Sequence, residues 1–221
     1  MKTVLKTAVC LLVLTGTGAF AQSQARFAEV RGTVEIQNAG STAWRPVSPG
    51  DVIGKNAVIS TGFKSTALIS IGDSRISVRP LTRLTLEELV QRDGAEKTDL
   101  YLRTGRIRAE VTPPAGLRGD FTVRSPSATA SVRGTEFEFD TVHLSVDNGR
   151  VLMEGAGGRV YVDAGQRSYV DQAEQRLVPS SEAETARLTP VLAELAGTGA
   201  AAAGSGPRVA ASAAVSVTAE W

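Results

Sequence analysis

Apolar and polar residues alternate along much of the chain, which is the pattern of β-strands with one buried face. The alternation is clearest in residues 121–140, where it predicts two strands joined through a Ser/Pro/Ala segment and a turn at Arg133-Gly134-Thr135. The residues expected to share the buried face are Phe121 and Val123 in the first strand, Ala128, Ala130 and Val132 in the joining segment, and Phe137 and Phe139 in the last strand.

Period two dominates from residue 26 to about residue 178, and turns rich in Gly, Pro, Asp, Asn and Ser interrupt it at short, even intervals. This combination predicts an all-β domain over residues 22–178, built as a stacked two-sheet sandwich or roll of short antiparallel strands. The leucines of residues 81–90 also fit helical spacing, but the alternation around Thr85 favours a strand. Residues 91–98 are polar and predict a hairpin loop.

A weak internal repeat places a glycine before a polar residue and a β-branched residue. It occurs at Gly32-Thr33-Val34, at Gly105-Arg106-Ile107 and at Gly149-Arg150-Val151. Repeats of this kind are typical of solenoids, so a short β-solenoid is the alternative to the sandwich. The irregular spacing of the three copies favours the sandwich.

The composition changes after Pro179. Ser181 and Glu184 form a capping-box pattern, and Thr189-Pro190 offers a second helix start, so residues 179–196 predict a short helical segment. Residues 197–221 begin as an Ala/Gly-rich linker. Apolar and polar residues alternate again in the last nine residues, which form either a strand or a disordered tail.

The first 21 residues have the features of a secretory signal peptide: Lys2 and Lys6, an apolar run over residues 8–14, and Ala19-Phe20-Ala21 as a cleavage pattern. The run is shorter than the ~20 residues that span a bilayer. We therefore expect an exported, periplasmic protein without a membrane span, and export beyond the envelope stays open.

Removal of residues 1–21 takes away two lysines and Cys10, the single cysteine. The remaining chain has 22 basic and 23 acidic residues and contains no disulfide. Such a balanced charge gives no general attraction to nucleic acid. The basic run of Arg103, Arg106 and Arg108 is expected to pair across strands with Glu136 and Glu138.

Candidate chemistry is sparse. His143 is the single histidine and is expected to point outward from a strand, which makes a poor transition-metal site. A nucleophilic triad needs a base held against a Ser, Thr or Cys, and no serine lies in a nucleophile-elbow motif. The sequence therefore predicts no catalytic residue, no metal and no cofactor. A pair of carboxylates remains the conceivable enzymatic arrangement.

An ordered set of residues resembles the FecR-like domain family over about residues 50–170. The matching positions are Gly50, Asp51, Ile53, Gly62, Ser65, Ala67, Asp73-Ser74, Pro80, Leu100, Leu102, Gly105, Ser125-Pro126, Ala128, Ala130, Arg133-Gly134-Thr135, Phe137, Gly149-Arg150-Val151 and Ala164-Gly165-Gln166. Members of this family include regulators of iron–citrate uptake, in which the domain lies in the periplasm on a membrane-spanning protein. This chain has a signal peptide in place of that span.

The resemblance implies a non-enzymatic module that recognises an envelope protein or a cell-wall component, in sensing or signalling. The alternative is an envelope hydrolase that uses a carboxylate pair. Arg133, Gly134, Thr135 and Phe137 are the motif residues, and they either fix a turn or contact a partner. A glycine-centred motif between regular strands favours the turn.

Overall fold

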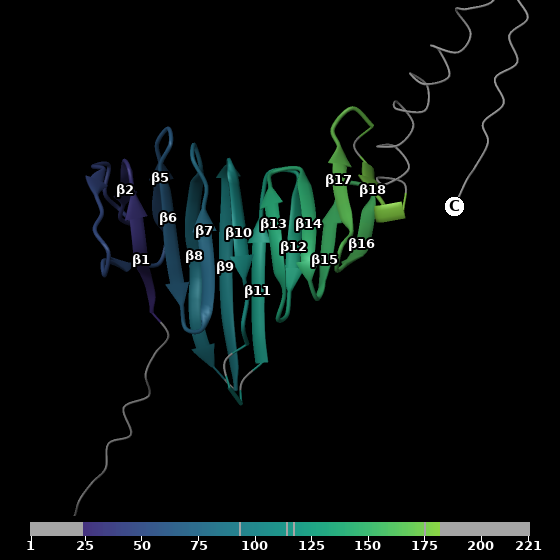
Figure 1. The fold of residues 1–221 in the computed structure, drawn as a ribbon, viewed down its shortest axis with the longest axis horizontal. Coiled ribbons are helices and arrows are strands. Elements are labelled where there is room, and N and C mark those ends of the chain that lie inside the picture. Colours follow the sequence, from purple (N-terminus) through teal and green to yellow (C-terminus); the bar gives the residue numbers. More distant parts are fainter. Residues whose placement is uncertain (1–23, 93, 114, 117, 175, 182–221) are drawn as a thin grey trace, which may run out of the picture.

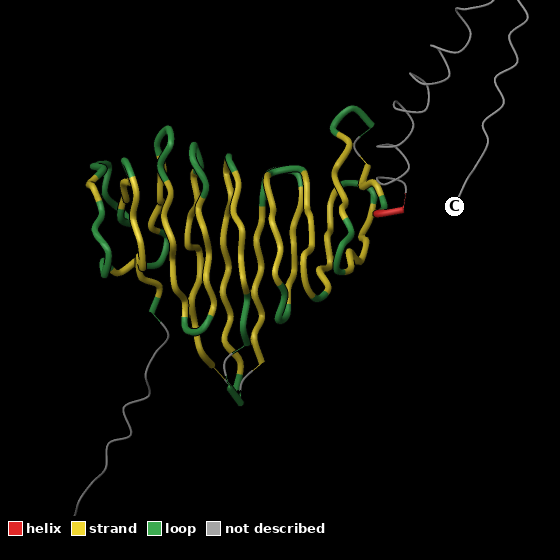
Figure 2. Tube along the Cα trace, viewed as in Figure 1, coloured by secondary structure: helices red, strands yellow, loops and turns green. Residues whose placement is uncertain are grey.

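The structure, a computed structural model, describes residues 24–181 except positions 93, 114, 117 and 175. Its strands extend from Ala25 to Val178, and Figures 1 and 2 show them as one elongated stack. The predicted signal peptide, residues 182–196 of the predicted helical segment, and the linker and tail all lie outside the described residues.

The strands form two nine-stranded sheets. Sheet A contains, in spatial order, β18 (Arg176–Val178), β17 (Arg167–Asp171), β14 (His143–Asn148), β13 (Glu136–Asp140), β10 (Arg106–Glu110), β7 (Ser74–Val78), β6 (Thr66–Ile71), β1 (Ala25–Arg31) and β4 (Val52–Ile53). Sheet B contains β16 (Gly158–Asp163), β15 (Arg150–Gly155), β12 (Ala128–Val132), β11 (Arg118–Arg124), β9 (Ala95–Thr104), β8 (Arg83–Arg92), β5 (Ala57–Thr61), β2 (Val34–Gln37) and β3 (Arg45–Pro46).

The chain passes back and forth between the two sheets while it advances along both. The sequence colours in Figure 1 therefore run in order along the long axis. Strand pairs are antiparallel, except that β9 and β11 run parallel because β10 crosses to sheet A between them. The predicted two-sheet sandwich is confirmed, and its linear advance gives it the neighbour-to-neighbour character of a solenoid.

The core lies between the sheets and follows directly from the period of two. In β13, Phe137 and Phe139 are fully buried and the acidic residues that alternate with them face outward. The ring of Phe137 meets that of Phe121 from sheet B edge-on, with centroids 6.4 Å apart and planes at 72°. Such a geometry stabilises an aromatic pair beyond its buried area. The aliphatic residues of both sheets join these rings in one cluster.

Two local predictions are corrected by the structure. The segment that joins residues 121–124 to the turn at Gly134 is itself a strand, β12, which pairs with β11 and β15. The predicted loop over residues 91–98 is mostly strand, since Gln91 pairs with Glu96 and Val90 with Lys97. This region forms strand although its side chains are polar, because the backbone of β9 pairs with β8 on one side and with β11 on the other.

Candidate functional site

The three glycines of the internal repeat lie at corners where the chain leaves one sheet and enters the other. Gly32 joins β1 to β2, Gly105 joins β9 to β10, and Gly149 joins β14 to β15. All three have positive φ, at 75°, 89° and 86° respectively. Glycine adopts this left-handed conformation without the steric cost that a Cβ imposes.

Each corner glycine packs against a buried hydroxyl side chain from a neighbouring turn. The partners are Ser65 at Gly32, Thr82 at Gly105 and Thr135 at Gly149. At Gly105 a Cβ would lie 2.3 Å from Thr82 Oγ1 and 2.5 Å from the Thr82 Cα. A side chain there would collide with backbone, so the corner accepts only glycine without movement of the chain.

The hydroxyls bond the residue that follows each glycine. The backbone N–H of Thr33 donates to Ser65 Oγ at 2.8 Å, and Thr135 Oγ1 donates to the carbonyl of Arg150 at 3.2 Å. Thr82 Oγ1 accepts from the Arg106 N–H at 3.0 Å and donates to the Arg106 carbonyl at 3.1 Å. These bonds replace the sheet bonds that the backbone loses where it turns the corner. The repeat in the sequence is therefore the signature of a corner.

The motif residues Arg133, Gly134, Thr135 and Phe137 surround the corner at Gly149. Gly134 has a φ of 64°, and the Thr135 side chain is the buried hydroxyl of that corner. Phe137 is fully buried in the core. Of the three side chains, that of Arg133 is accessible, and it donates to Asp120 Oδ1 on β11 at 2.9 Å and 3.2 Å.

The outer face of sheet A carries a ladder of ion pairs on β7, β10, β13 and β14. Arg108 pairs with Glu136 at 2.7 Å and with Asp147 at 2.9 Å, while Arg106 reaches Glu138 at 3.2 Å. The predicted pairing across strands is confirmed. Its geometry is diagonal, because Arg108 stands directly opposite Glu138 in the register of β10 and β13.

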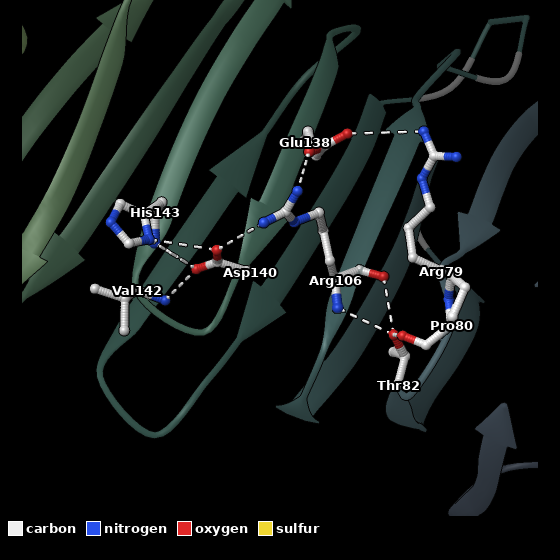
Figure 3. A network of polar contacts seen from close by, with 8 residues as sticks. All are labelled: Arg79, Pro80, Thr82, Arg106, Glu138, Asp140, Val142 and His143. Atoms are coloured by element: carbon white, nitrogen blue, oxygen red, sulfur yellow. Dashed lines mark hydrogen bonds and ion pairs between the residues drawn. The ribbon is translucent and has the colours of Figure 1, made fainter. Parts of the chain in front are cut away.

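An open cleft of about 620 Å³ lies at one end of the ladder. Arg79 and Arg106 both contact Glu138, and Arg106 also reaches Asp140 at 3.6 Å (Figure 3). Asp140 Oδ1 accepts the backbone N–H groups of Val142 and His143 at 2.8 Å and 2.7 Å. The lining residues are Arg79, Pro80, Leu81, Gly105, Arg106, Glu138, Asp140, Thr141, Val142 and His143.

The environment of Asp140 sets its protonation state. Partial burial by itself raises the pKa of this carboxyl, but the hydrogen bonds from the backbone N–H groups of His143 and Val142 outweigh burial, so the pKa lies below its usual value. Asp140 is therefore ionised at neutral pH and cannot act as a general acid. Its neighbour Glu138 is held between two arginines. Both carboxylates of the cleft therefore lie against arginine side chains.

Two large apolar side chains are exposed, one in the cleft and the other in a loop that is hydrogen-bonded to it. Phe63 is 74% exposed and Leu81, which lines the cleft, is 61% exposed. Their loops are joined by the Leu81 N–H, which donates to the carbonyl of Gly62 at 3.3 Å. Lys64 and Leu81 have φ of 55° and 56°. A bulky residue with positive φ is an outlier that the surrounding structure must hold in place.

The sequence pattern did not predict that Phe63 and Leu81 form an apolar rim, because Leu81 fits the strand predicted over residues 81–90. The available signal was the position of both residues directly after a turn, in Gly62-Phe63 and in Pro80-Leu81. Turn positions after glycine and proline are usually polar and accessible, so a large apolar residue there indicates either a core anchor or a contact surface.

The side chain of His143 is exposed, as predicted, and it lines the cleft. Its ring is 3.3 Å from the carboxylate of Asp140 and 5.7 Å from the ring centroid of Tyr169. The described residues contain no cluster of three potential metal ligands. Within the same residues, no helix has the length and apolarity needed to cross a membrane.

Comparisons with known proteins assign the central part of this structure. Residues 57–154 match the model of the family described as FecR protein. These residues of the chain are a FecR domain, somewhat shorter than the resemblance over residues 50–170 implied. The match begins with β5 and ends within β15, so β1–β4 and β16–β18 extend both sheets beyond it. No curated protein matches the chain significantly.

Two crystal structures of a "putative anti-sigma factor" from Parabacteroides distasonis ATCC 8503 are similar in fold. They are 16% and 15% identical to this chain, with TM-scores of 0.48 and 0.46. Each alignment covers 55% of this chain and 57% of the other chain. The similarity therefore spans little more than half the length of these proteins.

Proposed function

We propose that this chain is an exported, non-enzymatic FecR-type module that recognises a protein partner in the cell envelope as part of sensing or signalling. The family match supports the class of module. The observation that carries the proposal is the rim formed by Phe63, Leu81 and the cleft. It combines exposed apolar area with fixed charges, as the contact surfaces of proteins do.

The rim suits recognition because its parts are held rigidly. Leu81 is fixed between Pro80 and Thr82, and Thr82 is buried and bonded to Arg106 and Thr61. Asp140 and Glu138 are held by backbone and arginine donors. When a partner buries Leu81 and Phe63, the residues of this protein therefore lose little conformational freedom, which favours affinity.

The proposed location is the periplasm, because residues 1–21 have the pattern of a signal peptide. A cell-wall glycan is a further candidate for the partner, but the apolar side chains at the rim favour a protein. Fractionation of cells that express the full chain tests export. Recovery of the uncleaved protein in the cytoplasm would contradict it.

A site-specific photo-crosslinker tests the recognition surface. We expect a benzophenone side chain at Leu81 or Phe63 to capture one envelope protein, and the same group at Val52 to capture none. Val52 is an exposed apolar residue on β4, the edge strand of sheet A, which lies three strands from β7. Leu81→Asp should abolish capture from position 63 without lowering the melting temperature. Equal capture from Val52 and Leu81 would overturn the assignment of the rim.

A further inference from the structure

The two edges of the sandwich differ in their capacity to pair with another strand. At the N-terminal edge, β3 and β4 have two residues each, β3 ends at Pro46, and the connecting loop bonds back onto β1 through Asp51 and Gly50. Short strands and proline blunt an edge against further pairing. At the C-terminal edge of sheet B, β16 is six residues long, and among residues 24–181, as far as the structure describes them, it pairs with β15 on one side only.

The direction of the backbone groups of β16 follows from hydrogen bonds made by β16 and by its neighbour β15. The Asp163 N–H donates to Gln166 Oε1 and the Asp163 carbonyl accepts from the Gln166 N–H, both away from β15. On β15, the Arg150 carbonyl accepts from Thr135, on the side opposite β16. Because direction alternates along a strand, Gly158, Val160 and Val162 bond β15, while Arg159, Tyr161 and Asp163 face outward.

The edge therefore presents four backbone groups, the N–H and C=O of Arg159 and of Tyr161. Gln166 already occupies both groups of Asp163, which limits the registers that an incoming strand can adopt. A register that needs the backbone of Asp163 would break these two bonds. An antiparallel partner that uses only residues 159 and 161 keeps them intact.

We propose that β16 pairs antiparallel with β16 of a second copy of this chain, about a two-fold axis at Val160. In this register Arg159 stands opposite Tyr161 of the other copy, and Tyr161 opposite Arg159. The two pairs exchange four backbone hydrogen bonds, which uses every free group of the edge. The two sheets B join into one continuous sheet.

The side chains of β16 are complementary to themselves in this register. Tyr161 is 60% exposed and lies on the outer face of sheet B with Arg159. Across the two-fold axis, each Arg159 guanidinium reaches the ring of the opposite Tyr161, which favours a cation–π contact. Within one copy, Arg150 already makes such a contact with this ring, 5.7 Å from its centroid. The same residues thus supply both halves of the interface, as a two-fold contact requires.

The interface is small, since one strand edge buries less than the roughly 1,200 Å² of stable complexes. We expect a dimer in exchange with the monomer, which dilution dissociates. The rim at Phe63 and Leu81 lies outside the contact. The proposal is therefore independent of the proposed function, and the dimer would present two rims at once.

Disulfide trapping tests the register. In the full chain with Cys10→Ser, Val160→Cys introduces the single cysteine. Its counterpart in the second copy would lie at a Cα separation of about 4.5 Å, which a disulfide bridges. Oxidation should convert most of the protein to a cross-linked dimer. Arg159→Cys is the matched control, because the two positions lie diagonally at about 7–8 Å and should not bridge.

Proline substitution tests the hydrogen bonds without the cysteine. The Tyr161 N–H faces outward, so Tyr161→Pro should remove the dimer in sedimentation equilibrium and leave the melting temperature nearly unchanged. Val160→Pro removes a bond to β15 and should lower the melting temperature instead. Tyr161→Ala keeps the backbone groups and should weaken the dimer roughly 5- to 30-fold by loss of two cation–π contacts.

Three results would overturn the proposal. The first is a wild-type protein that stays monomeric at millimolar concentration, with no cross-link at position 160. The second is cross-linking at position 159 but not at position 160, which requires another register. The third is slow hydrogen exchange of the Arg159 and Tyr161 amides in the monomer, which would show that another part of the chain occupies the edge.

Discussion

The buried corners and the exposed ladder of sheet A meet in one tripeptide, Gly105-Arg106-Ile107, and they contribute to the protein in different ways. Gly105 makes the corner against Thr82, and Ile107 fills the core. Arg106 reaches outward to Glu138 and Asp140 at the cleft. Three consecutive residues thus belong to the turn, the surface and the interior.

The difference teaches where stability and recognition reside in this fold. A corner has no alternative geometry, because a clash with backbone or an unpaired buried N–H is costly. Ion pairs in the ladder remain in contact with water, which screens them, so each contributes little to folding. The residues of the ladder and the cleft can therefore contact a partner without loss of stability, whereas the corner residues are required for the fold.

The largest expected effect is that of Gly105→Ala. The left-handed backbone costs an L-residue about 1–2 kcal/mol, and the collision with Thr82 adds roughly 1–3 kcal/mol. We expect a loss of about 2–5 kcal/mol in the free energy of unfolding, measured by urea denaturation. Gly50→Ala is the control, since Gly50 has a φ of 94° and open space around it, and should lose only about 1–2 kcal/mol. Equal losses would show that contact with Thr82 is unimportant.

A smaller loss is expected for Thr82→Val, which keeps the shape of the side chain and removes its hydroxyl. The backbone N–H and carbonyl of Arg106 then lose their hydroxyl partner, which costs about 1–3 kcal/mol. Thr122→Val, on the partly exposed outer face of β11, should change the free energy of unfolding by less than about 0.5 kcal/mol. A Thr82→Val protein as stable as the wild type would contradict the role given to the corner hydroxyl.

Much of the fold could be predicted because its strands obey one rule. The alternation of Phe137 and Phe139 with acidic residues is unambiguous, and it places β13 correctly. The prediction of a loop over residues 91–98 was wrong because the pairing of this region depends on backbone hydrogen bonds to β8 and to the distant strand β11. A side-chain pattern carries no information about such bonds.

The candidate site was less accessible to sequence reasoning. The pairing of Arg106 and Arg108 with Glu138 and Glu136 followed from the outward positions of these residues. The rim did not, since the loops that carry Phe63 and Leu81 are joined by hydrogen bonds between two separate turns. The glycine repeat was visible, but its hydroxyl partners lie outside the repeat itself. Their spacing from each glycine varies, so no fixed motif reveals them.

In the ladder, Arg108→Gln should have a much smaller effect than either corner substitution. Its contacts with Glu136 and Asp147 remain partly exposed, so we expect a loss of about 0.2–1 kcal/mol. The loss should shrink further in 1 M salt, because screening weakens exposed ion pairs. Urea denaturation at low and high salt measures both effects. A loss as large as that of Thr82→Val, unchanged by salt, would remove the contrast between ladder and corners.

The smallest effect at neutral pH, but a distinct one on acidification, is expected for Asp140→Asn. Despite partial burial, hydrogen bonds from the backbone of His143 and Val142 keep the pKa of Asp140 below its usual value. A lowered pKa in the folded state means that ionised Asp140 stabilises the fold above the pKa of the unfolded chain, about 3.9. This contribution is lost as the pH falls through the lower pKa of the folded state. The wild type should therefore be more stable than Asp140→Asn near pH 6, and the difference should shrink as the pH falls below about 4 and disappear only below the pKa of the folded state. Asp73→Asn, in the turn between β6 and β7, provides the control in urea denaturation at each pH. A difference between wild type and Asp140→Asn that stays constant across this range would show that the amide fails for reasons of geometry, and that the charge at the cleft does not stabilise the rim.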